Sequence, residues 1–272
     1  MRRPGLLCLL IAAVAHGQQV QYDTLPRPII EKRLSSFGTA NLEREQTLRD
    51  LFTESGCSGA KLAEQIVKAK KPPNVICSLP GVELDSTIIV GAHFDFVKAG
   101  QGVVDNWSGA SLLPSLFQSL NAIPRRHNFL FVGFTDEELG LLGSSYFVRG
   151  LTKFDLRSIA AMVNMDSLGT GPTRFETDRS NKRLTDSLAA VAATVKIPIG
   201  IVNAHQVGRS DSDSFQDKKV PSINIHSLTK ETFPILHSSR DRMDAIHMDD
   251  YYDSYRLIAA YLAFLDLTLT VE

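Results

Sequence analysis

The chain has 272 residues, of which 43% are hydrophobic and 22% are charged. This composition is typical of globular proteins and excludes disordered, collagen-like and multi-span membrane proteins. The 29 Lys and Arg residues nearly balance the 30 Asp and Glu residues, which gives a formal net charge of -1. Because the charges balance so closely, they provide no electrostatic basis for binding nucleic acid or an anionic membrane, and we expect neither partner.

Residues 1–17 have the pattern of a secretory signal peptide. Arg2 and Arg3 precede an apolar run from Leu6 to Val14, and Ala15 and Gly17 follow that run. The run is much shorter than the roughly 20 apolar residues that span a bilayer. We therefore predict cleavage near Gly17, a secreted or periplasmic protein, and no membrane insertion after cleavage.

The segment 18–45 is polar, contains scattered prolines and shows no clear period, which predicts an extended N-terminal arm. Two helices are expected after the arm, because apolar residues recur at helical spacing. These residues are Leu48, Leu51 and Phe52 in the first helix, and Leu62, Ile66 and Val67 in the second, which ends before Pro72-Pro73.

From Asn74 onward, short β-rich runs alternate with longer helical patterns. The β-rich runs are Asn74–Cys77, Thr87–Val90, Asn128–Phe134, Ile159–Val163 and Ser222–Ile225. The helical patterns are Gly109–Leu120, Leu141–Val148, Asn181–Val195 and Tyr251–Leu267. This alternation predicts an α/β fold, a three-layer sandwich whose central, mostly parallel mixed sheet is covered by helices on both faces. No linker-like break follows residue 45, so we expect residues 46–272 to form one domain.

Two cysteines, Cys57 and Cys77, remain after the predicted cleavage. An even number of cysteines in an exported protein favours a disulfide between them. Two separate buried thiols remain the alternative, because the sequence does not reveal the distance between the two residues.

Histidines and carboxylates follow the apolar runs, where open α/β sheets bind their ligands. These residues are His93 and Asp95 after the second run, Glu137 and Glu138 after the third, Asp166 after the fourth, Asp105 at a helix start, and His237 with Asp241 near the end. Each has a structural alternative, such as a core histidine at His93 or a helix cap at Asp105. Their coincidence favours a shared site, and histidine with carboxylate suits Zn²⁺ in an open catalytic site.

The residues around these positions form longer motif blocks. The blocks are Gly91-Ala92-His93-Phe94-Asp95, Asp105-Asn106-Trp107-Ser108-Gly109, Asp136-Glu137-Glu138-Leu139-Gly140-Leu141-Leu142-Gly143-Ser144, Asn164-Met165-Asp166-Ser167-Leu168-Gly169, Ser210-Asp211 and His237-Ser238-Ser239-Arg240-Asp241. On these blocks, the chain from about Asn74 to Leu267 resembles the di-zinc aminopeptidase family of bacterial leucyl aminopeptidases, whose fold glutaminyl cyclase shares. Residues 46–272 would then form a zinc peptidase domain.

The resemblance implies a role for each ligand. Asp105 would bridge two zinc ions, with His93 and Asp166 completing one ion and Glu138 and His237 completing the other. Two metals roughly 3.5–4 Å apart can share a carboxylate in this way.

The remaining roles concern residues that do not bind metal. The resemblance implies that Glu137 is the general base. If the backbone there is extended, Glu137 and Glu138 point to opposite sides, so that one can bind metal while the other faces the water. Asp95 would orient His93 through its other ring nitrogen. Asp241 is a candidate partner for His237. The resemblance assigns no residue to substrate binding.

The sequence therefore predicts a secreted zinc exopeptidase, an aminopeptidase with two zinc ions and a peptide substrate. Two alternatives stay open: a glutaminyl cyclase that needs one zinc ion, and a non-catalytic binding domain that retained the fold. The complete ligand set favours hydrolysis. The sequon Asn106-Trp107-Ser108 adjoins Asp105, where a glycan would obstruct the site, so we interpret it as chance. The oligomeric state stays open.

Overall fold

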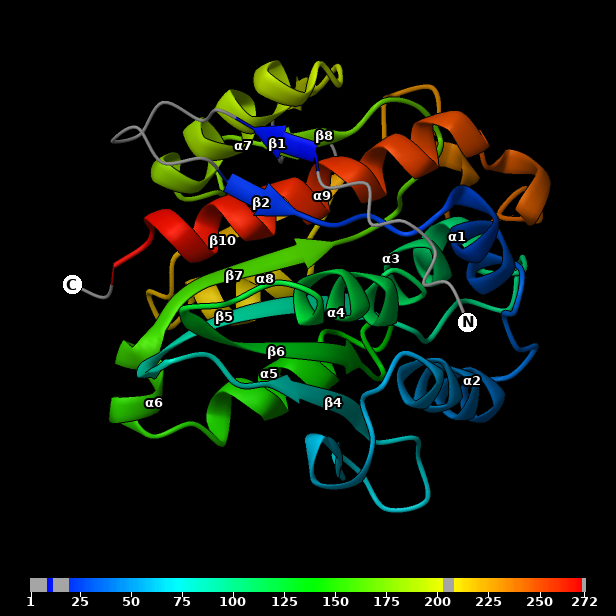
Figure 1. Cartoon of the computed structure of the whole chain (residues 1–272). Helices are drawn as coiled ribbons and strands as arrows, with labels where there is room; N and C mark the ends of the chain where they lie inside the picture. The colour runs from blue at the N-terminus through cyan, green and yellow to red at the C-terminus, as the bar shows by residue number, and fades with distance from the viewer. Residues whose placement is uncertain (1–8, 12–19, 203–207, 271–272) are drawn as a thin grey trace, which may run out of the picture.

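The structure is a computed structural model that describes residues 9–11, 20–202 and 208–270 (Figure 1). Within these residues, eight strands form one sheet in the order β3-β4-β6-β5-β7-β10-β8-β9. The strands are β3 Leu62–Gln65, β4 Asn74–Leu79, β5 Glu83–His93, β6 His127–Phe134, β7 Ile159–Met165, β8 Arg174–Glu176, β9 Gly200–Val202 and β10 Ser222–His226. A separate antiparallel pair joins β1 Leu9–Ile11 to β2 Val20–Tyr22. Apart from β1, the predicted signal peptide lies outside the described residues.

The centre of the sheet is parallel and its flanks are mixed. Strands β6, β5, β7 and β10 lie side by side and run in the same direction. Antiparallel pairs occur toward the edges, between β3 and β4, β4 and β6, and β8 and β10. The predicted mixed, mostly parallel sheet is confirmed.

Helices cover both faces of this sheet (Figure 1). The helices are α1 Arg27–Leu34, α2 Asn41–Glu54, α3 Ser108–Ala110, α4 Leu113–Asn121, α5 Leu142–Arg149, α6 Lys153–Ser158, α7 Lys182–Val195, α8 Asp211–Gln216 and α9 Met248–Thr268. One face packs against α4 and α7, both of which contact α9, and the other face packs against α6 and α8, with α5 beside α8. The predicted three-layer sandwich is confirmed.

The apolar runs of the central strands follow from this double cover. On β5, Ile88 and Val90 belong to the larger hydrophobic core, whereas Ile89 between them belongs to a second core on the opposite face. Successive side chains of a strand point to opposite faces, so a strand that is buried on both faces is apolar throughout.

The segment expected to form the second helix is a strand instead. Residues Leu62–Gln65 form β3 at the edge of the sheet, where Leu62 pairs with Cys77 and Gln65 with Asn74. Ile66 is 67% exposed, so it contributes nothing to the core. Three apolar residues within six positions are too few to specify a helix, whereas edge pairing satisfies the backbone of a short segment.

The prediction of an extended arm over 18–45 is wrong for much of that segment. Arg27–Leu34 form α1, and α2 begins at Asn41. Ile30 and Leu34, one helical turn apart, are buried in the larger core. Their spacing and Pro28 in the first turn of α1 are helix signals that the polar composition obscured.

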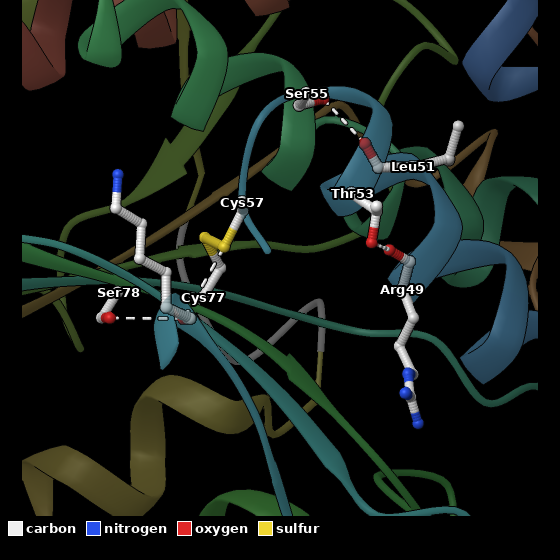
Figure 2. Close-up of a disulfide and its surroundings, with 8 residues drawn as sticks. Arg49, Leu51, Thr53, Ser55, Cys57, Cys77 and Ser78 are labelled. Carbon is white, nitrogen blue, oxygen red and sulfur yellow. Dashed lines mark hydrogen bonds between the residues drawn. A yellow bond between two sulfur atoms is a disulfide. The ribbon is translucent and has the colours of Figure 1, made fainter. Parts of the chain in front are cut away.

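The structure joins the predicted cysteine pair in a disulfide (Figure 2). Cys57 lies just beyond the end of α2, and Cys77 lies on β4, with 6.3 Å between their Cα atoms. Ser55 donates its hydroxyl to the carbonyl of Leu51 at 2.7 Å and so closes the last turn of α2. The disulfide therefore ties α2 to the sheet.

Candidate metal centre

The carboxyl ends of three neighbouring parallel strands supply most of the candidate ligands. His93 is the last residue of β5, Asp166 directly follows β7, and the Glu137-Glu138 pair follows β6. Asp105 comes from the Val103–Trp107 turn that precedes α3. Because parallel strands end at the same edge of a sheet, these residues meet there, as the sequence predicts.

The five candidate ligands form two groups that share Asp105. In the first group, His93 Nε2 lies 3.2 Å from Asp105 Oδ1 and 3.7 Å from Asp166 Oδ1. In the second group, His237 Nε2 lies 3.2 Å from Asp105 Oδ2 and 2.8 Å from Glu138 Oε2. Each oxygen of Asp105 therefore faces a different histidine, which is the arrangement of a bridging carboxylate.

The neighbouring Asn106 fixes the turn that carries Asp105. Its Oδ1 accepts hydrogen bonds from the amides of Gly109 at 2.9 Å and Ser167 at 3.1 Å, and its Nδ2 donates to the carbonyl of Met165 at 2.9 Å. Asn106 thereby ties the Asp105 turn to the end of β7. The side chain is also fully buried, so it cannot carry a glycan in the folded protein.

Asp95 contacts His93 as expected and also holds the Glu137-Glu138 turn. Its Oδ1 lies 3.5 Å from His93 Nδ1 and accepts the amide of Glu137 at 3.0 Å, while its Oδ2 accepts the amide of Glu138 at 3.2 Å. The backbone at this pair is a turn rather than an extended strand, since the amide of Gly140 donates to the carbonyl of Glu137 at 2.8 Å. The two carboxylates nevertheless point to different histidines.

Asp241 does not partner His237. Its Oδ1 accepts the amide of Val104 at 2.7 Å, and its Oδ2 accepts the amide of Asp105 at 3.2 Å. Within the described residues, no hydrogen bond or ion pair joins Asp241 to His237. The resemblance implied that pairing, but the loop turns so that Asp241 holds the backbone of Asp105 instead.

The model of peptidase family M28 matches residues 74–262. All five candidate metal ligands, from His93 to His237, lie within this range. The chain belongs to peptidase family M28. The resemblance drawn from the motif blocks is thereby confirmed.

Two aminopeptidases are among the relatives of this M28 protein. It is 27% identical over 207 residues to aminopeptidase YwaD of Bacillus subtilis, with 73% of this chain and 44% of that protein aligned. It is 25% identical to the solved structure of BSAP, a zinc aminopeptidase from Bacillus subtilis, with a TM-score of 0.65 over 74% of this chain and 51% of that one. The chain thus spans about half the length of these relatives.

A third likeness concerns the fold alone. Glutaminyl cyclase of Porphyromonas gingivalis matches with a TM-score of 0.66 at 16% identity, and the match covers 87% of this chain and 95% of that one. The similarity extends over nearly the whole cyclase, so the two proteins share the sheet and its helical layers.

The electrostatics of the M28 site show a shortage of positive charge. Burial, opposed by His93 and reinforced by nearby carboxylates, raises the pKa of Glu137 to about 10. Burial and the adjacent Asp105 raise the pKa of Glu138 to about 7. The hydrogen bond to Asp105 raises the pKa of His237 to about 9. These shifts share one cause, the crowding of carboxylates in a buried site, and divalent cations compete with protons for the same lone pairs.

The donor set fits zinc on two counts. It consists of imidazole nitrogens and carboxylate oxygens, which are the ligands of catalytic zinc sites. In addition, Glu138 Oε1 is buried without a hydrogen-bond partner, and such an atom is costly unless something binds it. A cation between Asp105, Glu138 and His237 would satisfy this oxygen.

The metal centre forms the floor of a cavity of about 630 Å³. Beyond the acidic groups and histidines, its walls are largely apolar. They are formed by Gly140, Leu141, Gly208, Arg209, Phe233, Pro234 and Leu236. This volume accommodates one or a few residues of a peptide beside the candidate ligands.

The sequence analysis gave no role to Asp211, although this residue lies in one of the motif blocks. This residue begins α8 and is completely buried, and burial raises its pKa to about 7. Its carboxylate in turn helps to raise the pKa of Glu137. Its position in the Ser210-Asp211 block was the signal, but only the packing of α8 shows that it lies near Glu137.

Proposed function

We propose that this protein is a zinc-dependent exopeptidase, an aminopeptidase that hydrolyses the first peptide bond of its substrates with two zinc ions. The observation that carries the proposal is Asp105, whose two oxygens face two separate histidines, each with its own carboxylate partner. The aminopeptidases among its relatives support the same activity.

The chain's residues would divide between the two ions. His93, Asp105 and Asp166 would hold the first, and Asp105, Glu138 and His237 the second. Zinc, when bound, supplies Lewis acidity that polarises a peptide carbonyl and lowers the pKa of water to about 7.

Glu137 is suited to move the proton. Its carboxylate lines the cavity, lies 3.9 Å from His93 Nε2, and belongs to neither ligand group. With cations bound in the two neighbouring groups, their charge would lower the pKa of Glu137 and leave its carboxylate ionised. It would then accept a proton from the attacking water and deliver it to the leaving amine. Asp95 holds the backbone of Glu137 in place for this transfer. The surrounding carboxylates would attract the cationic N-terminus of a peptide, which favours cleavage at that end.

We also place the protein outside the cytoplasm, in the periplasm or the medium. The basic and apolar pattern of residues 1–17 and the disulfide between Cys57 and Cys77 support this location. None of the described helices has the length and apolar character to span a bilayer. The partner is a peptide substrate, and the even charge balance favours neither nucleic acid nor an anionic membrane.

A glutaminyl cyclase is the second candidate, since that fold matches over 95% of the cyclase chain. Such an enzyme would need one zinc ion and would polarise a side-chain amide. The presence of two donor groups, the first with His93 and Asp166 and the second with Glu138 and His237, favours hydrolysis, because a one-zinc enzyme would use only one of them.

Metal content and product analysis test the proposal together. We expect two zinc ions per chain and metal-dependent release of chromophore from aminoacyl substrates. Glu137→Gln should retain both ions and lose activity by about 10²–10⁴-fold. One tightly bound zinc ion with pyroglutamate formation would instead establish the cyclase. Zinc-loaded protein that releases nothing from a broad aminoacyl panel would refute the aminopeptidase.

A further inference from the structure

Arg44 on α2 is a completely buried cation that lies outside the residues matched by the M28 model. Its guanidinium lies 4.0 Å from the ring centre of Phe96 and 5.7 Å from that of Trp107. Among the described residues, no carboxylate is in ion-pair contact with it. Burying a charge costs several kcal/mol unless other groups compensate, so the groups that it contacts indicate its role.

The partners of Arg44 are backbone carbonyls of the loop between two metal ligands. We define this 94–104 loop as the segment between His93 and Asp105. Arg44 Nη1 donates to the carbonyls of Phe94 at 3.2 Å and Gly102 at 3.0 Å, and Nη2 donates to Gln101. One guanidinium therefore holds the beginning and the end of the loop together. The planar fork of arginine allows several such bonds at once.

Asp241 holds the same loop through its amides. Its carboxylate accepts the amides of Val104 and Asp105, and its main-chain oxygen accepts the amide of Gln101 at 2.7 Å. Burial lowers the pKa of Arg44 to about 10, while Asp241 and other carboxylates oppose this effect, so Arg44 is charged at neutral pH. The loop is thus fixed between a buried cation and a buried anion.

The loop has little room to adjust once these contacts are made. Gly102 has a φ of +58°, and a Cβ atom there would lie 2.3 Å from the Cβ of Phe96. Arg44 is itself anchored, because Nε donates to the carbonyl of Gly38 at 3.1 Å and the far end of α2 is tied to β4 by the disulfide of Cys57. A rigid support therefore extends from the sheet through α2 to the loop.

We infer that Arg44 is a positioning residue of the metal centre: by holding the 94–104 loop, it places Asp105 Oδ1 3.2 Å from His93 Nε2, ready to bind one ion between them. This inference rests on the proposed function. Arg44 touches neither metal nor substrate, and it acts through the two ligands at the ends of the loop.

The test compares Arg44→Met with Arg33→Met. Arg33 on α1 is a matched control, since it is also buried but donates to Ser115 Oγ at 2.9 Å and Gln118 Oε1 at 2.7 Å, away from the loop. Zinc affinity is measured by competition with a chromophoric chelator, and ligand geometry by the visible spectrum of the Co²⁺-substituted protein. Mutation of a group that orients a metal ligand typically lowers metal affinity by about 10–100-fold.

We expect Arg44→Met to weaken at least one zinc ion by about tenfold or more and to shift the Co²⁺ spectrum. Arg33→Met should lower the melting temperature while leaving zinc affinity and spectrum unchanged. Wild-type affinity and spectrum in Arg44→Met would overturn the inference, as would the same change in both variants. If Arg44→Met does not fold, Arg44→Lys replaces it: the charge remains, the fork is lost, and an unchanged affinity and spectrum again overturn the inference. Absence of zinc from the wild-type protein would instead refute the proposed function.

Discussion

Replacing Asp95 by Asn tests how the structure organises both the metal centre and the base. The two carboxylate oxygens of Asp95 accept one amide each, from Glu137 at 3.0 Å and from Glu138 at 3.2 Å. An asparagine has one acceptor oxygen and a donor NH₂ group, so it can keep only one of these bonds. Because Asp95 is 1% exposed, water cannot take the place of the other.

The magnitude follows from the bond that is lost. A hydrogen bond to a charged group contributes about 1.5–3 kcal/mol, and about 1.4 kcal/mol corresponds to a tenfold change. Asp95→Asn also removes the negative charge 3.5 Å from His93 Nδ1, which weakens His93 as a ligand. We therefore expect kcat/KM to fall by about 10–100-fold and zinc to dissociate more readily.

The assay is kcat/KM on an aminoacyl-chromophore substrate, together with zinc content after dialysis. Asp155→Asn is the control, because Asp155 likewise accepts two hydrogen bonds, from the amide and the hydroxyl of Thr152 at the start of α6. That helix precedes β7 and so lies at the opposite end of the sheet from the metal centre. A kcat/KM for Asp95→Asn within twofold of wild type would refute the reasoning.

Three further predictions concern the metal count, the disulfide and pH. Asp166→Asn should reduce zinc content to one ion per chain and Asp105→Asn to less than one, as measured by elemental analysis; equal losses would argue against a shared ligand. Replacing Cys57 and Cys77 by Ser should lower the free energy of unfolding by about 3 kcal/mol, because the disulfide closes a loop over a sequence separation of 20; urea unfolding checks this, and a change below about 1 kcal/mol would contradict it. Burial lowers the pKa of His226 to about 4, against about 6.5 when unfolded. As the pH falls, the unfolded chain takes up this proton first, so the stability present above pH 6.5 should decline by about 3 kcal/mol toward pH 4. Urea unfolding of the metal-free protein should show that the free energy of unfolding declines less toward pH 4 in His226→Asn than in the wild type. An identical decline in both proteins would exclude His226 as its source.

The sequence was most informative where local pattern and burial coincide. The apolar runs around Val90, Phe131 and Val163 predicted the three central strands, because strands covered on both faces must be apolar throughout. The candidate ligands could be located for the same reason, since His93 and Asp166 follow these runs and parallel strands end at one edge. Segments with few apolar residues were predicted poorly. In β3 and α1, pairing and packing with distant residues determined the structure.

The sequence by itself determined the central strands of the sheet, the family and the candidate metal ligands, because each of these follows from short continuous motifs. Tertiary structure alone decided which residues support that set. Asp241 serves the backbone of Asp105 rather than His237, and Arg44, 61 positions before Asp105 in the printed sequence, holds the loop that carries it. Such support acts through backbone carbonyls and amides, which every residue possesses. No residue pattern records these contacts, so only the packing of α2 and the loops against the sheet reveals them.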